Sequence, residues 1–220
     1  MVFDRYAYGP VAGLYDELAR LYSRGRIGLT KELSLEFVNP GDRVLYPGVG
    51  RGAEALEAAR KGALVTGVDL SPEMLARFRA GLDREGLDAR LIEADVSRHR
   101  PSEPYDVVVA NYFLNLFDAV AARAMLEILG RSLRPGGLLV ITDFARPQGA
   151  APGRWASELH YRPVNWIAWI LGLCALHPIL DYPALLLEVG GFRVVSQRRL
   201  PVCFGDNPAY LLLAAERLAV

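Results

Sequence analysis

The segment that decides the fold is Val44-Leu45-Tyr46-Pro47-Gly48-Val49-Gly50-Arg51-Gly52, in which an apolar strand runs into three closely spaced glycines. A helical pattern begins directly after Gly52. Glycine permits a positive φ and lets a ligand approach the backbone, and the helix that follows presents free N–H groups. The segment therefore predicts a buried strand, a ligand-binding turn and a helix that begins near Gly52.

Short apolar runs alternate with helical patterns downstream of this segment. The expected strands are Arg43 to Tyr46, Leu64 to Val68, Arg90 to Glu93, Tyr105 to Ala110 and Leu138 to Thr142. Further helices are expected to begin near Pro72 and Ala119, with Ser71 and Asp118 as their caps. The run Arg134-Pro135-Gly136-Gly137 predicts a turn before the fifth strand. This alternation is typical of an α/β fold, in which helices connect parallel strands.

The two ends of the chain follow different patterns. Residues 1–40 predict an N-terminal helical segment, whereas residues 145–180, rich in proline and aromatic residues, predict a lid-like insertion over the sheet edge. After a helix over Tyr182 to Val189, the runs Arg193 to Arg199 and Tyr210 to Glu216 suit an antiparallel addition to a parallel sheet. We expect residues 1–220 to form a single domain.

Composition and charge exclude several classes of protein. With 52% hydrophobic and 23% charged residues, the chain has the composition of a compact globular domain. Its 25 basic and 25 acidic residues give a formal net charge of +0, so nucleic acid is not an expected partner. Cys174 and Cys203 fit neither a disulfide framework nor a zinc site, and no histidine and carboxylate cluster has the spacing of metal ligands.

The sequence also bears on location. The first residues lack the apolar core of a signal peptide, and a cytoplasmic protein is expected. The most apolar stretch, Pro163 to Leu180, contains an uninterrupted apolar run of only about 11 residues, which is typical of a core or interfacial helix and too short for a transmembrane span. Transient contact with a membrane surface and the oligomeric state stay open.

Two carboxylates follow strands near the glycine-rich turn. Asp69 closes the second strand, about 20 residues after the glycines, where it can accept hydrogen bonds from both hydroxyls of a ribose. Asp95 follows the third strand and can accept from an adenine amino group, or simply cap a helix. Because Gly48, Gly50 and Ala53 also satisfy the dinucleotide fingerprint, nicotinamide or flavin binding stays open on these residues alone.

Six short motifs in order resemble those of class I S-adenosylmethionine-dependent methyltransferases. They are Gly48-Val49-Gly50-Arg51-Gly52, Val68-Asp69-Leu70-Ser71, Glu93-Ala94-Asp95, Tyr105-Asp106-Val107-Val108, Leu133-Arg134-Pro135-Gly136-Gly137 and Gly190-Gly191-Phe192. The resemblance implies a Rossmann-like, mostly parallel seven-stranded sheet with an antiparallel last strand and helices on both faces. It implies S-adenosylmethionine as cofactor and S-adenosylhomocysteine as product. The implied cofactor-binding residues are Gly48, Gly50, Gly52, Asp69, Leu70, Asp95, Val96, Asn111 and Tyr15.

One position departs from the family pattern. The family has an acid two residues before the first glycine, where it helps to place the amino-acid end of the cofactor, but this chain has Tyr46 there. Tyr15 or Asn111 can substitute. Tyr15-Asp16 and Leu21-Tyr22-Ser23-Arg24-Gly25 resemble elements of the ubiquinone/menaquinone C-methyltransferases, which places Tyr15 near the methionine end; a packing role for Tyr15 is the alternative.

The methyl acceptor is expected at the carboxyl ends of the strands, where open α/β sheets bind their ligands. Asn111, Tyr112 and Asp143 end the fourth and fifth strands and are the candidate catalytic residues, with hydrogen-bonded loop ends as the alternative. His160, Trp166 and Trp169 of the insertion are candidate substrate contacts, with ordinary packing as the alternative. His99, between two arginines, is predicted to lie in a solvated loop.

These residues predict methyl transfer to a small or medium, apolar acceptor of quinone-like or lipid-like chemistry. In-line transfer from a sulfonium needs alignment and a partly dehydrated site more than a strong catalytic group. Two alternatives stay open. One is a protein that binds S-adenosylmethionine without catalysis, because Tyr46 stands where the family has an acidic residue. The other is a nicotinamide-dependent oxidoreductase.

Overall fold

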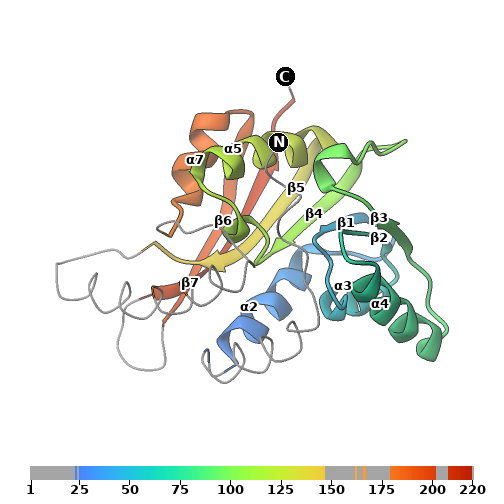
Figure 1. The fold of residues 1–220 in the computed structure, drawn as a ribbon. Coiled ribbons are helices and arrows are strands. Elements are labelled where there is room, and N and C mark those ends of the chain that lie inside the picture. The colour runs from blue at the N-terminus through green and yellow to red at the C-terminus, as the bar shows by residue number, and fades with distance from the viewer. Residues whose placement is uncertain are drawn as a thin grey trace.

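In the computed structural model, the described residues are 23, 25–146, 162, 166, 179–201 and 208–219. Those residues form one seven-stranded sheet in the order β3-β2-β1-β4-β5-β7-β6 (Figure 1). Its strands are β1 (Arg43–Pro47), β2 (Leu64–Asp69), β3 (Arg90–Glu93), β4 (Tyr105–Asn111), β5 (Leu133–Phe144), β6 (Phe192–Pro201) and β7 (Pro208–Arg217). The longer helices are α2 (Arg26–Ser34), α3 (Ala53–Arg60), α4 (Pro72–Glu85), α5 (Ala119–Ser132) and α7 (Tyr182–Val189).

Strand direction confirms the predicted sheet. Strands β1 to β5 pair in parallel, whereas β7 pairs antiparallel with both β5 and β6. The order reverses direction between β1 and β4, because the chain first builds outward from β1 to β3 and then returns to the other side of β1. Ligands of open α/β sheets bind beyond the carboxyl ends of the strands at such a reversal.

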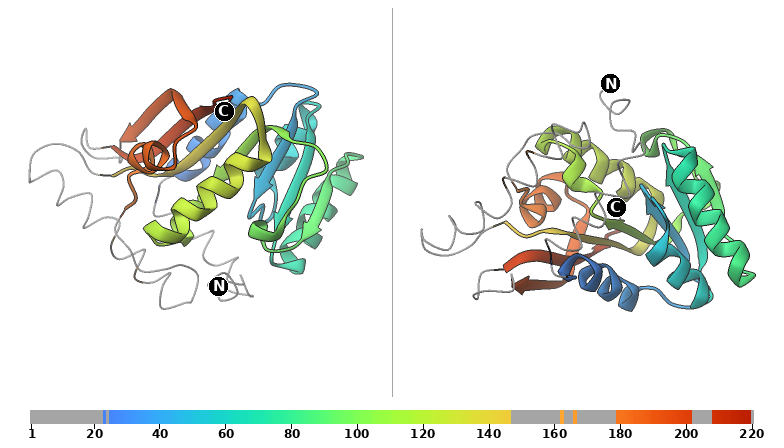
Figure 2. Two further views of the ribbon diagram at one scale, coloured as in Figure 1. Left: turned by 90° about the horizontal axis from the view of Figure 1, so that it is seen from above. Right: turned by 60° about the horizontal axis from the view of Figure 1, so that its bottom comes forward.

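Helices cover both faces of the sheet (Figure 2). On one face Val44 and Tyr46 of β1 join a buried cluster with Ala55 of α3 and Phe78 of α4. On the other face Leu45 joins a cluster formed mainly with α5 and α7. Successive side chains of a strand point to opposite faces, so a strand that is covered on both sides must be apolar throughout. This explains the continuous apolar run that opens the fold-deciding segment.

The predicted helix caps are present. The Ser71 Oγ accepts a hydrogen bond from the Met74 backbone N–H at 3.3 Å, with a proline in the first turn. The Asp118 carboxylate accepts from the Ala121 N–H at 2.8 Å. Each cap satisfies an N–H that the first turn of a helix leaves without a partner. The predicted starts of α4 and α5 are therefore confirmed.

The fifth strand begins earlier than predicted. It starts at Leu133, which pairs with Tyr105, and the register then shifts so that Val107 pairs with Leu138. The intervening Arg134 to Gly137 form an irregularity within the strand, where Gly136 has φ 74°, instead of a turn before it. The error arose because a proline and two glycines predict a turn locally, whereas pairing of Leu133 is a contact across the sheet.

The prediction of a solvated His99 was wrong. Its side chain is buried, with 8% of its surface exposed, and its Nε2 lies 2.8 Å from the Tyr105 hydroxyl. Burial and two nearby arginines, Arg90 and Arg100, lower the pKa of His99. The flanking arginines predicted solvent, but η3 (Val96–Arg98) turns the histidine back onto β4.

Much of the predicted insertion falls outside the described residues, including His160 and Trp169. Trp166, which is described, is helical and 58% exposed. Tyr15 also falls outside them, so the structure describes the predicted N-terminal helical segment only from Ser23 onward and, there, gives α2. Among the described residues there is no helix of the length and apolarity needed to cross a membrane.

Candidate functional site

The glycine-rich turn lies between the carboxyl end of β1 and the start of α3. Gly48, Gly50 and Gly52 all have positive φ, at 60°, 56° and 71°. A Cβ on Gly48 would lie 2.6 Å from Phe113, and a Cβ on Gly52 would lie 2.2 Å from the Phe78 ring, whereas a Cβ on Gly50 would point into open space. Gly48 and Gly52 are therefore required by packing, and Gly50 leaves the turn open where a ligand can approach the backbone.

Asp69 at the end of β2 faces this turn. Its half-buried carboxylate accepts hydrogen bonds from the Gly50 N–H and the Ser71 N–H, each at 2.8 Å. Burial raises the pKa of Asp69, and hydrogen bonds from backbone N–H groups oppose that rise. Each carboxylate oxygen retains acceptor capacity for a ligand hydroxyl. The carboxylate is thus held rigidly against the glycine turn before any ligand binds.

Asp95 follows β3, which pairs in parallel with β2 so that Asp69 lies opposite Glu93. Its carboxylate accepts from the Ser97 N–H at 2.8 Å and caps the short helix η3. Leu70 is exposed by 38%, whereas Val96 is 7% exposed and belongs to the core. The capping alternative for Asp95 is therefore present in the structure, and its second oxygen is still able to accept from a ligand.

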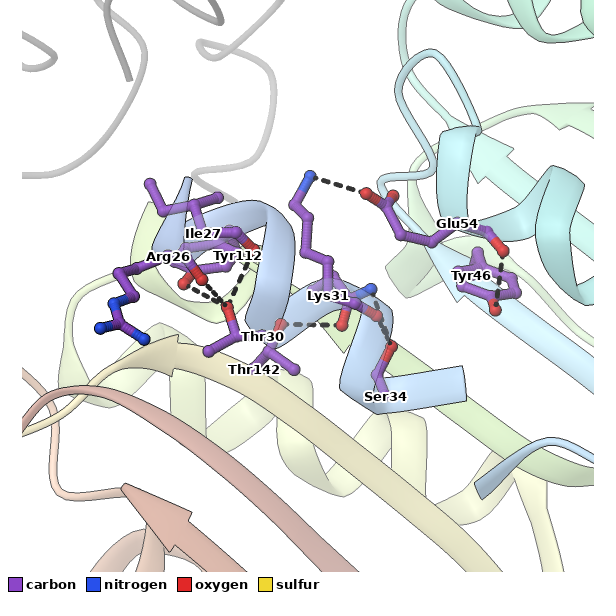
Figure 3. Close-up of polar contacts among 10 residues, drawn as sticks. Arg26, Ile27, Thr30, Lys31, Ser34, Tyr46, Glu54, Tyr112 and Thr142 are labelled. Carbon is purple, nitrogen blue, oxygen red and sulfur yellow. Dashed lines mark hydrogen bonds and ion pairs between the residues drawn. The ribbon is translucent and has the colours of Figure 1, made fainter. Parts of the chain in front are cut away.

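Asn111 is the last residue of β4 and Tyr112 follows it, and both side chains contact α2. Figure 3 shows Tyr112 beside Thr30 of α2. The Asn111 side chain accepts from the Thr142 hydroxyl at 2.8 Å and donates to Ser34 Oγ at 3.3 Å. The Tyr112 hydroxyl lies 2.8 Å from Thr30 Oγ1. These contacts fix α2 over the carboxyl ends of β4 and β5.

Tyr112 has a positive φ, and the pKa of its hydroxyl is too high for it to act as a general base at neutral pH. Its φ of 49° is the only positive value for a non-glycine among the described residues, and such strain often marks a functional site. Burial raises the pKa of Tyr112 well above its usual range, although the contact with Thr30 opposes this. The hydroxyl stays protonated at neutral pH and serves better as a donor than as a base.

Asp143, predicted to lie at the crevice or at a hydrogen-bonded loop end, has a fully buried side chain. Its carboxylate accepts from the Tyr182 hydroxyl at 2.7 Å, from the Phe144 N–H at 2.8 Å and from the Asn115 N–H at 3.2 Å. Burial raises its pKa to about 7, and these hydrogen bonds limit the rise. The carboxyl group thus ties β5 to α7 and to the loop after β4. The sequence placed it correctly at the strand end but could not show that α7 covers it.

Tyr46 occupies the family's acidic position without offering a charge. Its side chain is 3% exposed and belongs to the cluster under α3. Burial and the nearby Glu54 raise the pKa of Tyr46 well above its usual range. Its hydroxyl lies 3.5 Å from the Glu54 carbonyl oxygen, a long contact. The end of β1 therefore supplies an apolar wall at this position.

Sequence reasoning missed the polar residues of α2 and the start of α3. Thr30 and Ser34 are fully buried and reach the end of β4, and Lys31 forms an ion pair with Glu54. A usable signal was present, since Thr30 and Ser34 are four residues apart and so share one helix face. Polar residues spaced in this way on a helix that must pack against a sheet predict hydrogen-bond partners on that sheet.

Comparison with known proteins agrees with this geometry. Residues 44–137 match a family model described as a methyltransferase domain. The chain is 34% identical to demethylmenaquinone methyltransferase of Tropheryma whipplei over 74% of this chain and 71% of that protein. It is 30% identical to ribosomal protein L11 methyltransferase of Thermus thermophilus over 61% of this chain, and there it spans about half of the relative's length, 52%.

Solved structures share the fold. Magnesium protoporphyrin IX methyltransferase from Synechocystis, solved with bound SAH, superposes with a TM-score of 0.64 at 20% identity, over 90% of this chain and 84% of that one. The antiparallel β7 inserted before β6 also differs from the all-parallel order 3-2-1-4-5-6 of dinucleotide-binding sheets. Sequence, fold and relatives together place this chain in the family of class I S-adenosylmethionine-dependent methyltransferases.

Proposed function

We propose that this protein transfers the methyl group of S-adenosylmethionine to a small or medium, apolar acceptor of quinone-like or lipid-like chemistry. The observation that carries the proposal is the Asp69 carboxylate, held by backbone N–H groups against an open glycine turn at the point where the strand order reverses. A carboxylate in that place accepts from the two hydroxyls of a ribose.

The residues present fit an adenosyl cofactor. Asp69 would hold the ribose, Asp95 would accept from the adenine amino group, and Leu70 and Val96 would border the adenine ring. Gly48, Gly50 and Gly52 would bring the backbone close to the ligand. When bound, S-adenosylmethionine supplies an electrophilic methyl group on a sulfonium, whose positive charge is lost in the reaction.

The chain contributes alignment and exclusion of water. Loss of the sulfonium charge is favoured by a partly dehydrated site, and a rigid wall that orients the acceptor supplies much of the rate. Asn111 is fixed between Thr142 and Ser34, and the Tyr112 hydroxyl, held by Thr30, remains protonated. Both would orient an acceptor by hydrogen bonds. Asp143 would help to hold the ends of β4 and β5 in place through its hydrogen bond from the Tyr182 hydroxyl.

Two observations support an apolar acceptor. Several of the relatives at 32–35% identity are named demethylmenaquinone methyltransferases. Residues 145–180 of this chain concentrate tryptophan and aliphatic side chains directly after β5, and Trp166 is 58% exposed. We propose that this segment covers the acceptor, with Trp166, Trp169 and His160 among its contacts.

Calorimetry followed by a transfer assay tests the proposal. The purified protein is expected to bind S-adenosylmethionine and S-adenosylhomocysteine and to show no heat with NADH. With methyl-labelled S-adenosylmethionine, label should move to demethylated naphthoquinones and more slowly to polar phenols. Binding without transfer to any acceptor of an apolar panel would favour the non-catalytic alternative, and NADH binding would favour the oxidoreductase.

A further inference from the structure

The amino-acid end of S-adenosylmethionine is a zwitterion that needs a partner for each charge. An ammonium and a carboxylate that leave water for a half-buried site are costly unless each meets an opposite charge or a hydrogen bond. If Asp69 and Asp95 hold the adenosine end at β2 and β3, the other end extends across the glycine turn toward β1 and β4. Tyr46, the side chain at the end of β1, is buried and uncharged.

Among the described residues, one ion pair lies at that place, between Lys31 of α2 and Glu54 of α3. Its Nζ and Oε1 atoms are 3.4 Å apart, and their side chains are 28% and 20% exposed. Glu54 is the second residue of α3, two positions after Gly52 and beside Tyr46. Figure 3 shows Lys31 and Glu54 reaching toward each other across the gap between their helices.

Lys31 is held over the end of β4 by its neighbours in the helix. Thr30 and Ser34 anchor α2 to Tyr112 and Asn111, and the Lys31 Nζ lies 5.9 Å from the centre of the Tyr112 ring. The pair thus spans β1 and β4, the two strands between which the sheet order reverses. This is the strand pair beyond which ligands of open α/β sheets bind.

The pair is loose enough to exchange partners. Its separation of 3.4 Å exceeds the 2.7–2.9 Å, approximately, of a charge-assisted hydrogen bond between an ammonium and a carboxylate. Both side chains are also partly exposed, and such pairs contribute little to stability because water screens them. A ligand that brings its own ammonium and carboxylate replaces one weak pair with two.

We propose that Glu54 binds the α-ammonium and Lys31 binds the α-carboxylate of the cofactor. This pair takes the role of the acidic residue that the family has at the position of Tyr46. The inference rests on the proposed cofactor binding and adds to it the residues that recognise the methionine end. The two charges are contributed by two different helices. Binding of the cofactor therefore also couples α2 to α3.

Three ligands that share the adenosine group distinguish the contribution of the ammonium to affinity from that of the carboxylate. S-adenosylhomocysteine carries the ammonium and the carboxylate, decarboxylated S-adenosylhomocysteine carries the ammonium alone, and methylthioadenosine carries neither. Their affinities are measured by calorimetry on the whole chain, so the readout does not depend on turnover. Thermal unfolding of each variant without ligand checks that the fold is retained.

Each variant has a distinct expected pattern. Glu54→Gln should weaken S-adenosylhomocysteine and its decarboxylated form by about ten- to a hundredfold, with methylthioadenosine unchanged within about twofold. Lys31→Met should weaken S-adenosylhomocysteine about as much, but leave the decarboxylated form unchanged or tighter, since Glu54 is then free for its ammonium. Glu57→Gln, one turn further along α3 at an exposed position, is the matched control and should alter none of the three.

Two results overturn the inference while leaving the proposed function intact. One is an equal loss for all three ligands in Glu54→Gln, because the pair would then only dock α2 on α3. The other is no loss for S-adenosylhomocysteine in either variant. If the unaltered protein binds none of the three ligands, the proposed function itself fails.

Discussion

Replacing Asp143 with asparagine removes a carboxyl group whose protonation is expected to control stability near neutral pH. The carboxyl is fully buried at the end of β5, and burial raises its pKa from 3.8 to about 7 in the folded protein. The donors Tyr182, Phe144 and Asn115 offset part of that burial cost. An unfolded chain loses this proton near pH 4, so the folded state binds more protons between pH 4 and 7.

The sign and size of the effect follow from that difference in bound protons. A state that binds more protons is favoured at low pH, so the free energy of unfolding should fall as the pH rises from 4 to 7 and level off above 7. At about 1.36 kcal/mol for each pKa unit, a rise from 3.8 to about 7 corresponds to about 4 kcal/mol over the whole range. Between pH 5 and 7 the contribution of Asp143 is about 2 kcal/mol, because the folded carboxyl is already half ionised at pH 7.

Urea unfolding followed by tryptophan fluorescence measures this contribution at pH 5, 6, 7 and 8. The difference in unfolding free energy between the natural chain and Asp143→Asn should shrink by about 2 kcal/mol from pH 5 to 7 and change by less than about 0.5 kcal/mol from pH 7 to 8. Asp88→Asn is the control, because the Asp88 side chain is 92% exposed. A difference that does not change with pH would mean that Asp143 is ionised throughout and that the burial argument is incorrect.

Three further predictions concern the turn, the cofactor and the acceptor. Asp69→Ala should weaken both S-adenosylmethionine and S-adenosylhomocysteine by about 2 to 4 kcal/mol in calorimetry, and unchanged affinity would remove Asp69 from the site. Gly52→Ala should lower the free energy of unfolding in urea by about 2 to 4 kcal/mol, because Gly52 has φ 71° and its Cβ would lie 2.2 Å from the buried Phe78 ring. Gly86→Ala is the control and should cost only about 1 kcal/mol, because Gly86 has φ 64° but open space around its Cβ. Equal losses would contradict the packing argument. The double variant Trp166→Ser, Trp169→Ser should keep cofactor affinity and lose turnover of apolar acceptors. Normal turnover would place the acceptor elsewhere, and unfolding would mean that the tryptophans stabilise the fold instead of binding the acceptor.

Most of the sheet was predictable because its signals are local. The apolar runs that became β1 to β4 needed only the residues within each strand, and the caps Ser71 and Asp118 act within one helical turn. The antiparallel tail was predictable because two strand-like runs are joined by a loop too short for a helical crossover. The start of β5 was not, since the pairing of Leu133 with Tyr105 depends on another strand.

The candidate site divides in the same way. Gly48, Gly50, Gly52 and Asp69 could be found from spacing alone, because a strand, a turn and a helix in sequence place them together. The partners of Asn111 and Tyr112 could not, because Ser34 and Thr30 lie 77 and 82 residues away along the chain. A buried polar group must find a partner, but the sequence does not say which one.

The sequence by itself therefore determined the order of elements, the glycine turn and the carboxylate at the end of β2, since each follows from residues within a few positions of one another. The tertiary structure alone decided that Asp143 is sealed under α7, that His99 turns inward, and that Lys31 and Glu54 meet beside Tyr46. The physical reason is that these contacts join separate elements. They arise only when packing of the helices on the sheet brings side chains together whose positions no local pattern records.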